Sequence, residues 1–466
     1  MADAASARSQ IRQLRSLGVG ALRNPLYRSG YALIANVVGT TVVGIGYWAV
    51  AAHFYSREQV GQASALVAAL VVVSNFAQLN LAYTLPRFLP RAGRRAGRLI
   101  SYGYGASSAT ALVIGVAFII VLPRLSPQWH YLASSAQLSI GFVAAAVVWG
   151  IFALQDAALL GLHRPSIVPI ENFVYGVAKL LVLFALISLL PRTGVFIAWI
   201  IPLAINVPAV NWLIFHRYVP RSENSGAVAT VEPREIIGFT MVDYVGNVLN
   251  QSAGNLLPLL VLTVLGASAN ASFYVAWTVT TGLSLLALSF ATSLLVEGSA
   301  RPDKLAELTK GVTLRTLVVT VSGAAVLGLG SHLVLAIYGH GYAARAAVLL
   351  GLLAAGSVFY GLLAIVFSID RIVGRVGRAT ATRLGMAVVT LAGSWLLLRR
   401  MGINGVGVAW LAGNFVIAMV RVPTIVSAMR SGVPARRSTG SPTQPATTSL
   451  GPWPGTSRPG RHRRDS

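Results

Sequence analysis

The sequence predicts an all-α polytopic membrane protein with 12 transmembrane helices, and three observations lead to this fold class. Twelve apolar stretches, most of them 20–27 residues long, alternate with polar gaps. Each stretch is long enough to cross a bilayer core of about 30 Å as a helix that rises about 1.5 Å per residue. Every second gap is rich in arginine, and 55% of the 466 residues are hydrophobic while only 11% are charged.

The predicted helices follow one another in two sets of six, separated by the longest inner gap between helices. The first set is Ser29–His53, Gln59–Leu85, Leu99–Leu122, Ser135–Leu160, Ile167–Leu190 and Gly194–Phe215. The second set is Ile236–Leu265, Ala271–Leu295, Val312–Leu329, Ala346–Phe367, Leu384–Leu398 and Ile403–Ile425. We expect the helix at Leu384–Leu398, which is short, to begin near Gly377, and the one at Val312–Leu329 to be shifted toward Ile337.

The distribution of basic residues predicts the orientation of these helices. The gaps after the even-numbered helices hold 17 Lys or Arg residues, whereas the gaps after the odd-numbered helices hold 6. Basic gaps stay on the cytoplasmic side, so both termini are predicted to be cytoplasmic. The net charge of +24 then reflects topology and a basic tail. It predicts contact with membrane lipids and no nucleic-acid partner.

The same segmentation predicts the domain organisation. A basic N-terminal segment (1–28) precedes an N-terminal six-helix lobe (29–215), a cytoplasmic linker (216–235) and a C-terminal six-helix lobe (236–428). The tail (429–466) is rich in Pro, Ser, Thr, Gly and Arg, a composition typical of disorder. Because six is an even number, both lobes enter the membrane from the same side, and an axis along the membrane normal relates them most simply.

The residues expected of an enzyme are missing. The chain has no cysteine and no phosphate-binding loop motif, and its seven histidines show no metal-ligand spacing. The predicted outer loops are short, and Glu58 is the only carboxylate in them. We therefore predict no catalytic residues, no cofactor and no metal site.

Lys179 is the sharpest candidate for a functional residue, because an ionisable group inside a membrane helix costs roughly 2.5–3.5 kcal/mol on insertion scales. Lys179 lies near the middle of Ile167–Leu190 and forms one ridge with Glu171 and Tyr175, each four residues apart. Two interpretations are open. Lys179 is either a cationic anchor in a water-filled cavity, or it is satisfied by a carboxylate or carbonyl groups of a neighbouring helix.

A second polar face lies on the helix Ile236–Leu265. Asp243, Asn247 and Asn250 fall close together around the helix axis, and Gln251 widens that face. A hydrated or substrate-facing wall is one interpretation, and interhelical hydrogen bonding, worth about 0.6 kcal/mol per bond, is the other.

Polar residues of the first two helices predict the opposite wall of the same space. Asn36, Thr40 and Tyr47 share a face of Ser29–His53, and Asn75 and Gln78 lie one turn apart on the next helix. If the two lobes are equivalent, the first and seventh helices occupy matching positions, so that both polar faces line a central cavity.

The stretch from Asn24 to Leu99 resembles the N-terminal region of bacterial polysaccharide (O-antigen-type) flippases. These belong to the superfamily that also holds lipid II flippases and multidrug and toxic-compound extrusion transporters. The resemblance lies in GYW (46–48), VGQASAL (60–66) and LPRFLPRAGR (85–94). Over about residues 24–428 the rest of the chain matches by topology.

The resemblance implies two lobes around a central cavity that moves a polyprenyl-diphosphate-linked oligosaccharide between the leaflets of a bacterial-type cytoplasmic membrane. Cationic residues would hold the diphosphate, and Arg28, Arg87 and Lys179 are the candidates, with Asn247 and Asn250 beside them. Asp243 is the candidate for ion coupling. A polysaccharide polymerase or glycosyltransferases are the expected protein partners.

Three alternatives remain open from the sequence. An ion-coupled multidrug antiporter of the same fold predicts an acid-dominated cavity, and the mid-membrane charge here is a lysine instead. A membrane enzyme is disfavoured by the scarcity of outer acids. A non-transporting membrane scaffold would show the same pattern of helices.

Overall fold

The computed structural model describes residues 25–191, 193–223, 233–241 and 244–431. Throughout these residues the chain folds into helices joined by short turns, and no strand occurs among them. The prediction of an all-helical membrane protein is therefore confirmed.

The helices before residue 224 follow the first set of predicted segments. They are α2 (Pro25–Phe54), α3 (Arg57–Ala77), α4 (Leu81–Ala92), α5 (Ala96–Leu125), α6 (Ala136–Gly161), α7 (Ile167–Leu189), α8 (Gly194–Leu213) and α9 (Val219–Glu223). Short helical turns connect some of them: η1 (Gly93–Arg95), η2 (Pro127–Ala133) and η3 (Ile214–Tyr218).

The helices after residue 232 follow the second set. They are α10 (Pro233–Met241), α11 (Tyr244–Leu265), α12 (Ala267–Ala300), α13 (Leu305–Leu329), α14 (Ser331–Ala336), α15 (His340–Ile372), α16 (Val376–Met401) and α17 (Ile403–Ser431), with the turn η4 (Pro302–Lys304) before α13. The early start expected for the helix at Leu384–Leu398 is confirmed, because α16 begins at Val376.

Ten helical segments of the described residues are long and apolar enough to cross a membrane. The chain is therefore a multi-pass integral membrane protein. The predicted helices Ser29–His53 and Ile236–Leu265 are not among the ten, and parts of both lie outside the residues whose side chains are described. Within the second of them, Ser252–Leu265 forms a shorter apolar helix.

The prediction of one continuous helix over Gln59–Leu85 is wrong. Helix α3 ends at Ala77, and α4 begins at Leu81 after a turn in which Leu79 and Asn80 have positive φ angles of 49° and 63°. Asparagine tolerates this left-handed conformation better than most residues do. The turn contains the polar residues Gln78 and Asn80, but apolar residues lie on both sides of it, so hydropathy averaged over a window does not reveal the break.

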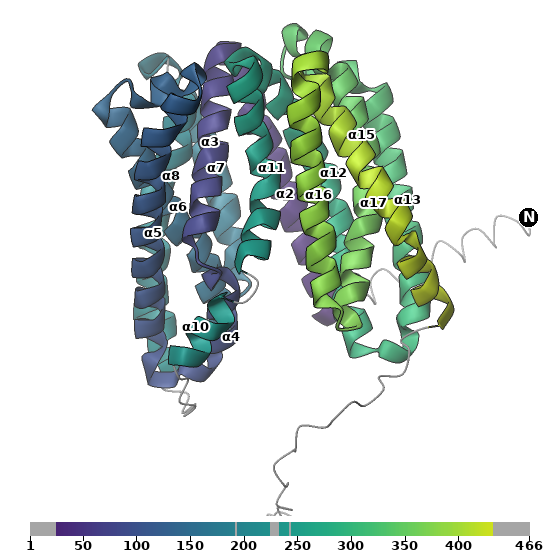
Figure 1. Cartoon of the computed structure of the whole chain (residues 1–466). Helices are drawn as coiled ribbons and strands as arrows, with labels where there is room; N and C mark the ends of the chain where they lie inside the picture. The colour runs from purple at the N-terminus through teal and green to yellow at the C-terminus, as the bar shows by residue number, and fades with distance from the viewer. Residues whose placement is uncertain (1–24, 192, 224–232, 242–243, 432–466) are drawn as a thin grey trace, which may run out of the picture.

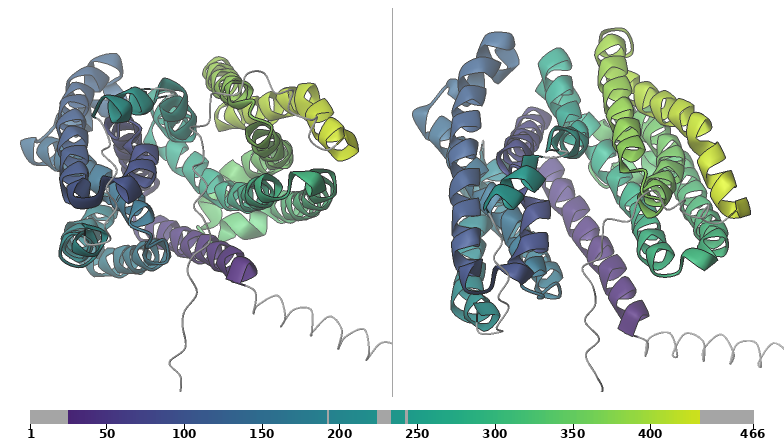
Figure 2. Two further views of the ribbon diagram at one scale, coloured as in Figure 1. Left: turned by 90° about the horizontal axis from the view of Figure 1, so that it is seen from below. Right: turned by 60° about the horizontal axis from the view of Figure 1, so that its bottom comes forward.

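The helices gather in two groups (Figure 1). Helices α3 and α5–α8 lie on the left of the view, helices α12, α13 and α15–α17 lie on the right, and α11 runs between them. Helix α2 packs against α7 of the first group and against α12 of the second, and Figure 2 shows it beside both.

The two groups touch most closely where α3 meets α12. Asn270 of α12 is fully buried, and its Nδ2 donates to the backbone oxygen of Gly61 at 2.8 Å and to Ser64 Oγ at 3.1 Å. A Cβ atom on Gly61 would overlap the backbone of Ala267, so only glycine permits this approach. Nearby, Trp129 Nε1 donates to Thr263 Oγ1 at 3.0 Å.

Candidate functional site

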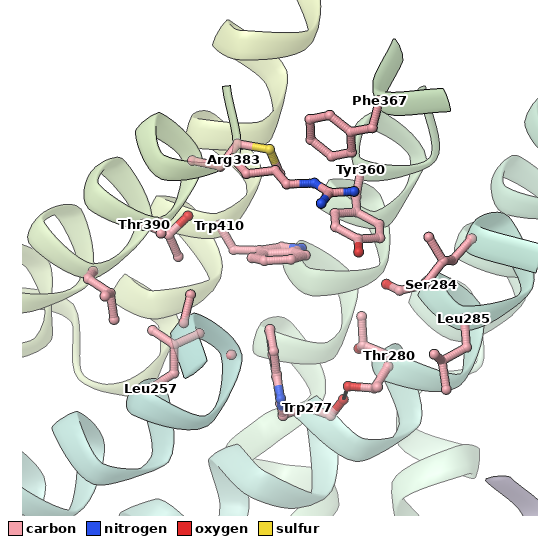
Figure 3. A pocket seen from close by; sticks show the side chains of 17 residues that line it. Leu257, Trp277, Thr280, Ser284, Leu285, Tyr360, Phe367, Arg383, Thr390 and Trp410 are labelled. Atoms are coloured by element: carbon pink, nitrogen blue, oxygen red, sulfur yellow. Dashed lines mark hydrogen bonds between the residues drawn. The ribbon is translucent and has the colours of Figure 1, made fainter. Parts of the chain in front are cut away.

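A cavity of about 280 Å³ lies among α11, α12, α15, α16 and α17 (Figure 3). Its walls combine aromatic rings, hydroxyl groups and one arginine. The lining residues are Ala253, Gly254, Leu257, Trp277, Thr280, Thr281, Ser284, Leu285, Leu288, Tyr360, Phe367, Arg383, Met386, Ala387, Thr390, Leu391 and Trp410.

Two helices each present one complete face to this cavity. The lining positions of α12 are 277, 280, 281, 284, 285 and 288, and those of α16 are 383, 386, 387, 390 and 391. This spacing of three and four residues is that of a single helix face. The wall is therefore built on long, rigid elements and not on loops.

Among the described residues, Arg383 is the only charged side chain that lines the cavity. Its guanidinium points between Phe367 and Tyr360 (Figure 3), and its Cζ lies 4.5 Å from the centre of the Phe367 ring. Among the described residues no carboxylate lies within ion-pair distance of it. The nearby Asp370 is paired with Arg421 instead. The cavity therefore has a positive charge that no acid in its wall neutralises.

Trp410 adds an unused hydrogen-bond donor to the aromatic wall. Its indole Nε1 is buried and has no hydrogen-bond partner within the described part of the chain. The ring stacks on Tyr360 with centroids 5.7 Å apart and meets Trp277 edge-on at 5.1 Å. A Cβ on Gly356 would come within 2.7 Å of Trp410 Nε1, so this glycine allows the ring to lie against α15.

The hydroxyl groups of the wall are held by their own helix and by one neighbour. Thr280 and Thr281 donate to backbone oxygens one turn earlier, at 2.9 and 2.8 Å. Ser284 Oγ lies 3.2 Å from Ser357 Oγ. A hydroxyl oxygen that donates in this way still has lone pairs to accept a hydrogen bond. The cavity can therefore bind an anionic group at Arg383 and polar hydroxyl groups along α12.

Lys179, the predicted cationic anchor, lies in a second aromatic environment in the first group of helices. It is 7% exposed. Its Nζ lies 3.7 Å from the centre of the Trp199 ring and 5.3 Å from the centres of Tyr47 and Tyr175. In the described residues neither a carboxylate nor a carbonyl oxygen is bonded to it. Three aromatic rings therefore surround the ammonium group.

The other predicted residues whose side chains are described do not join Lys179 or Arg383 in one site, except for Tyr47. Tyr47 is buried, and its hydroxyl donates to the backbone oxygen of Val195. Gln78 is buried at the end of α3 and donates to Ser74 Oγ at 3.4 Å. Thr40 and Asn75 are half-buried, and Arg87 is exposed on α4. None of these residues lines the cavity at Arg383.

The remaining predicted residues have no described side chain. Arg28 and Asn36 lie on α2, and Asn247, Asn250 and Gln251 lie on α11. Asp243, the predicted coupling residue, lies outside the described residues. The described part of the chain brings no three His, Cys, Asp or Glu residues together in a way that could hold a metal ion.

Sequence reasoning missed the site on α12, although a signal was present. The residues Trp277, Thr280, Thr281 and Ser284 form a polar and aromatic stripe at helical spacing. The hydroxyl groups of this stripe are less conspicuous than the amides of Ile236–Leu265. Arg383 directly precedes the segment Leu384–Leu398, but α16 begins seven residues before Arg383, at Val376, which places Arg383 about two turns inside the helix.

No family model matches the sequence, and no curated protein matches it. Solved structures do match. One is an inward-facing multidrug resistance MATE family transporter of the MOP superfamily (TM-score 0.59, 14% identity, covering 85% of this chain and 94% of that chain). Another is an outward-facing MATE transporter (TM-score 0.59, 13% identity, 88% and 98% covered).

A third match is a MOP superfamily transporter from Pyrococcus furiosus, for which a binding pocket of reversed polarity suggests a different function (TM-score 0.60, 14% identity, 88% and 98% covered). At these identities the similarity shows the fold alone. The chain has the fold of MATE family transporters of the MOP superfamily, and these structural neighbours are transporters and not enzymes.

Proposed function

We propose that this protein is a flippase that moves a polyprenyl-diphosphate-linked oligosaccharide from the inner to the outer leaflet of a cytoplasmic membrane by alternating access. The observation that carries this proposal is the cavity at Arg383, whose single charged side chain among the described residues is cationic and whose walls combine aliphatic side chains, aromatic rings and hydroxyl groups. The fold supports the transport step, because solved neighbours exist in inward-facing and outward-facing conformations.

The chemistry of the cavity fits such a cargo. An arginine can donate two parallel hydrogen bonds to one phosphate group. The indole N–H of Trp410 is buried without a partner in this conformation, and a rotation of the ring toward the cavity would make it a further donor for a phosphate or sugar oxygen. The flat faces of Trp277 and Tyr360 suit the apolar face of a sugar ring. A cavity of about 280 Å³ takes the diphosphate and an adjoining sugar, while the lipid chain stays in the bilayer.

A protein is needed for this movement because the headgroup loses its hydration in hydrocarbon. Burying an unpaired polar group costs several kcal/mol, and an isolated charge costs far more. A cavity that supplies one cation and several hydroxyl groups replaces part of the water shell. The site lies within the second helix group beside α11, which runs between the two groups. Rocking of the two groups would then expose the α11 side of the cavity to one leaflet at a time.

The proposed architecture is the predicted one, with twelve spans in two six-helix lobes around a central cavity and both termini cytoplasmic. Arg28, Arg87, Lys179, Asn247 and Asn250 are proposed to contribute along the path of the cargo. Because Lys179 is enclosed by rings in this conformation, we assign the first contact with the diphosphate to Arg383. Asp243 is the proposed coupling residue.

A multidrug antiporter is the competing function, since solved structures of this fold are described as multidrug resistance transporters. A site for organic cations is expected to lack an uncompensated cation in its wall, because like charges repel. Among the described residues the cavity contains Arg383 and no acid. This difference favours an anionic cargo over a cationic one. The experiment therefore compares the binding of an anionic ligand with that of a cationic ligand.

The test is a binding titration of the purified, full-length protein with a short-chain polyprenyl-diphosphate monosaccharide and, separately, with tetraphenylphosphonium. We expect Arg383→Gln to weaken binding of the diphosphate at least about tenfold, because a hydrogen bond to a charged group contributes about 1.5–3 kcal/mol. The affinity of Arg383→Lys for the diphosphate should lie between those of Arg383→Gln and the wild type, because lysine keeps the charge but lacks the planar guanidinium that donates two parallel hydrogen bonds.

Arg399→Gln is the matched control, because Arg399 is on the same helix but lies at its other end beside Trp395, outside the cavity. Leaflet-to-leaflet transport of the same lipid in proteoliposomes completes the test. Binding of tetraphenylphosphonium without binding of the diphosphate would overturn the flippase proposal in favour of the antiporter. Binding of neither would favour the scaffold.

A further inference from the structure

Three aromatic rings from three helices surround the ammonium group of Lys179. Tyr47 comes from α2, Tyr175 from α7 and Trp199 from α8. All three ring centres lie within 5.3 Å of Nζ, inside the limit of about 6 Å for an attractive cation–π contact. We call these three residues the Lys179 box.

The rings of the box are held in place independently of the lysine. Tyr47 donates to the backbone oxygen of Val195, and Tyr175 donates to the backbone oxygen of Trp199 at 2.9 Å. Both tyrosine rings meet the indole of Trp199 nearly at right angles, with centroids 5.4 and 6.4 Å away. A box that is fixed by its own contacts should keep its shape when the lysine side chain is removed.

The charge of Lys179 is not neutralised by an acid. Glu171 lies on the same ridge two turns earlier, and neither of its carboxylate oxygens has a hydrogen-bond partner within the described residues. No other carboxylate in that part of the chain reaches the ammonium group. The rings are therefore the groups that stabilise the cation in this position, which is the arrangement by which aromatic cages recognise organic ammonium ions.

We propose that Lys179 is a built-in occupant of an aromatic cage for organic ammonium ions, and that its presence excludes such ions from the first helix group. A tethered ammonium group has a high effective concentration at its own site, so a free organic cation competes poorly with it. Lys179 thereby determines charge specificity. The proposal rests on the geometry of the Lys179 box alone and stands apart from the function assigned to Arg383.

The experiment is a calorimetric titration of the detergent-solubilised, full-length Lys179→Ala variant with n-propylammonium, which matches the side-chain atoms that the substitution removes. We expect the variant to bind n-propylammonium at least about tenfold more tightly than the wild type does. 1-Propanol, which has nearly the same shape and no charge, should bind much more weakly. Lys179→Arg should behave like the wild type, because a guanidinium still fills the box.

One further variant distinguishes an aromatic cage that binds cations from a cavity that binds any small molecule of the right size. Lys179→Ala combined with Trp199→Leu should lose most of the gain, since Trp199 makes the shortest cation–π contact. Equal binding of propanol and propylammonium by Lys179→Ala would overturn the proposal, and so would unchanged binding in the double variant. A folded Lys179→Ala protein that binds no ammonium ion would overturn it as well.

A second measurement needs no change at position 179. The chain has three lysines, and Lys304 and Lys310 are exposed. Under reductive methylation of the wild type we expect Lys304 and Lys310 to react and Lys179 to be protected. Trp199→Leu should increase the reaction at Lys179. If Lys179 reacts as fast as the other two in the wild type, its ammonium group is not enclosed and the proposal fails.

Discussion

The Nζ atom of Lys179 lies 3.7 Å from the centre of the Trp199 ring, with Lys179 on α7 and Trp199 on α8. The second helix group contains a related pair. Arg383 on α16 and Trp410 on α17 line one cavity. In both groups a cation of the last helix but one is near a tryptophan of the last helix. The difference is that the lysine is enclosed by rings, whereas the arginine lines a cavity.

Removing the indole of Trp410 should weaken binding of the diphosphate-linked sugar. Trp410→Phe keeps a stacking ring and loses the N–H, so we expect a loss of about twofold to tenfold, the size of one neutral hydrogen bond. Trp410→Leu should lose more, because the stack on Tyr360 also disappears. Calorimetry with the same ligand measures both effects.

Trp395→Phe is the control, since Trp395 is half exposed on α16 and does not line the cavity. If Trp395→Phe weakened binding as much as Trp410→Phe does, Trp410 would not be a binding residue.

A disulfide between α3 and α12 should stop transport. Ser64 Oγ lies 3.1 Å from Asn270 Nδ2, and the chain contains no cysteine of its own. In the variant Ser64→Cys, Asn270→Cys, oxidation should fix the two helix groups together and abolish movement of lipid between the leaflets. A reductant should restore activity. The single Ser64→Cys variant controls for the substitution, and full transport by the cross-linked protein would show that this contact does not open.

Asp370 and Arg421 form a buried ion pair between α15 and α17, with the carboxylate side chain only 1% exposed. Asp370→Asn should leave the guanidinium without a countercharge and lower stability by roughly 3–5 kcal/mol. Thermal unfolding in detergent measures the change. The exposed Asp303→Asn is the matched control. The double variant Asp370→Asn, Arg421→Gln should recover part of the loss, and a double variant that is no more stable than Asp370→Asn would show that the pair is not the cause.

The predicted orientation can be tested with single cysteines, because the chain has no native one. Ser134 lies in a predicted outer gap and Ser166 in a predicted inner gap, and both are exposed. In intact cells a membrane-impermeant maleimide should label Ser134→Cys and leave Ser166→Cys unlabelled until the cells are broken. The reverse pattern would place the basic gaps outside and would contradict cytoplasmic termini.

The carboxylates show how far pairing can be predicted from position along a helix. Asp156, Glu297 and Asp370 all lie near predicted cytoplasmic helix ends, where loop arginines are common, so position alone predicts that each pairs with one. Asp370 does pair with an arginine, but this residue, Arg421, lies on α17 and not in a loop. Asp156 instead accepts a hydrogen bond from Asn172 at 3.3 Å, and Glu297 accepts one from Ser293 at 3.5 Å. Which partner lies opposite an acid depends on helix packing, and one sequence does not contain that information.

The sequence by itself determined the class of fold. Apolar length and alternating basic gaps are properties of each segment separately, since every spanning helix must satisfy its own backbone hydrogen bonds within the membrane. The early start of α16, which begins at Val376, followed from the same reasoning. The break at Leu79 and Asn80 did not, because the left-handed conformation of two residues is not visible in hydropathy.

Only the tertiary structure decided which polar residues meet. Lys179 was recognised from the sequence because a charge inside a membrane helix is conspicuous, but its partners are rings from α2 and α8 that are 20 or more positions away. Arg383 and the stripe on α12 become one site through the packing of α12 and α16 around α15 and α17. Helix periodicity fixes the face on which a residue lies, whereas the neighbour of that face is set by the packing of the whole bundle.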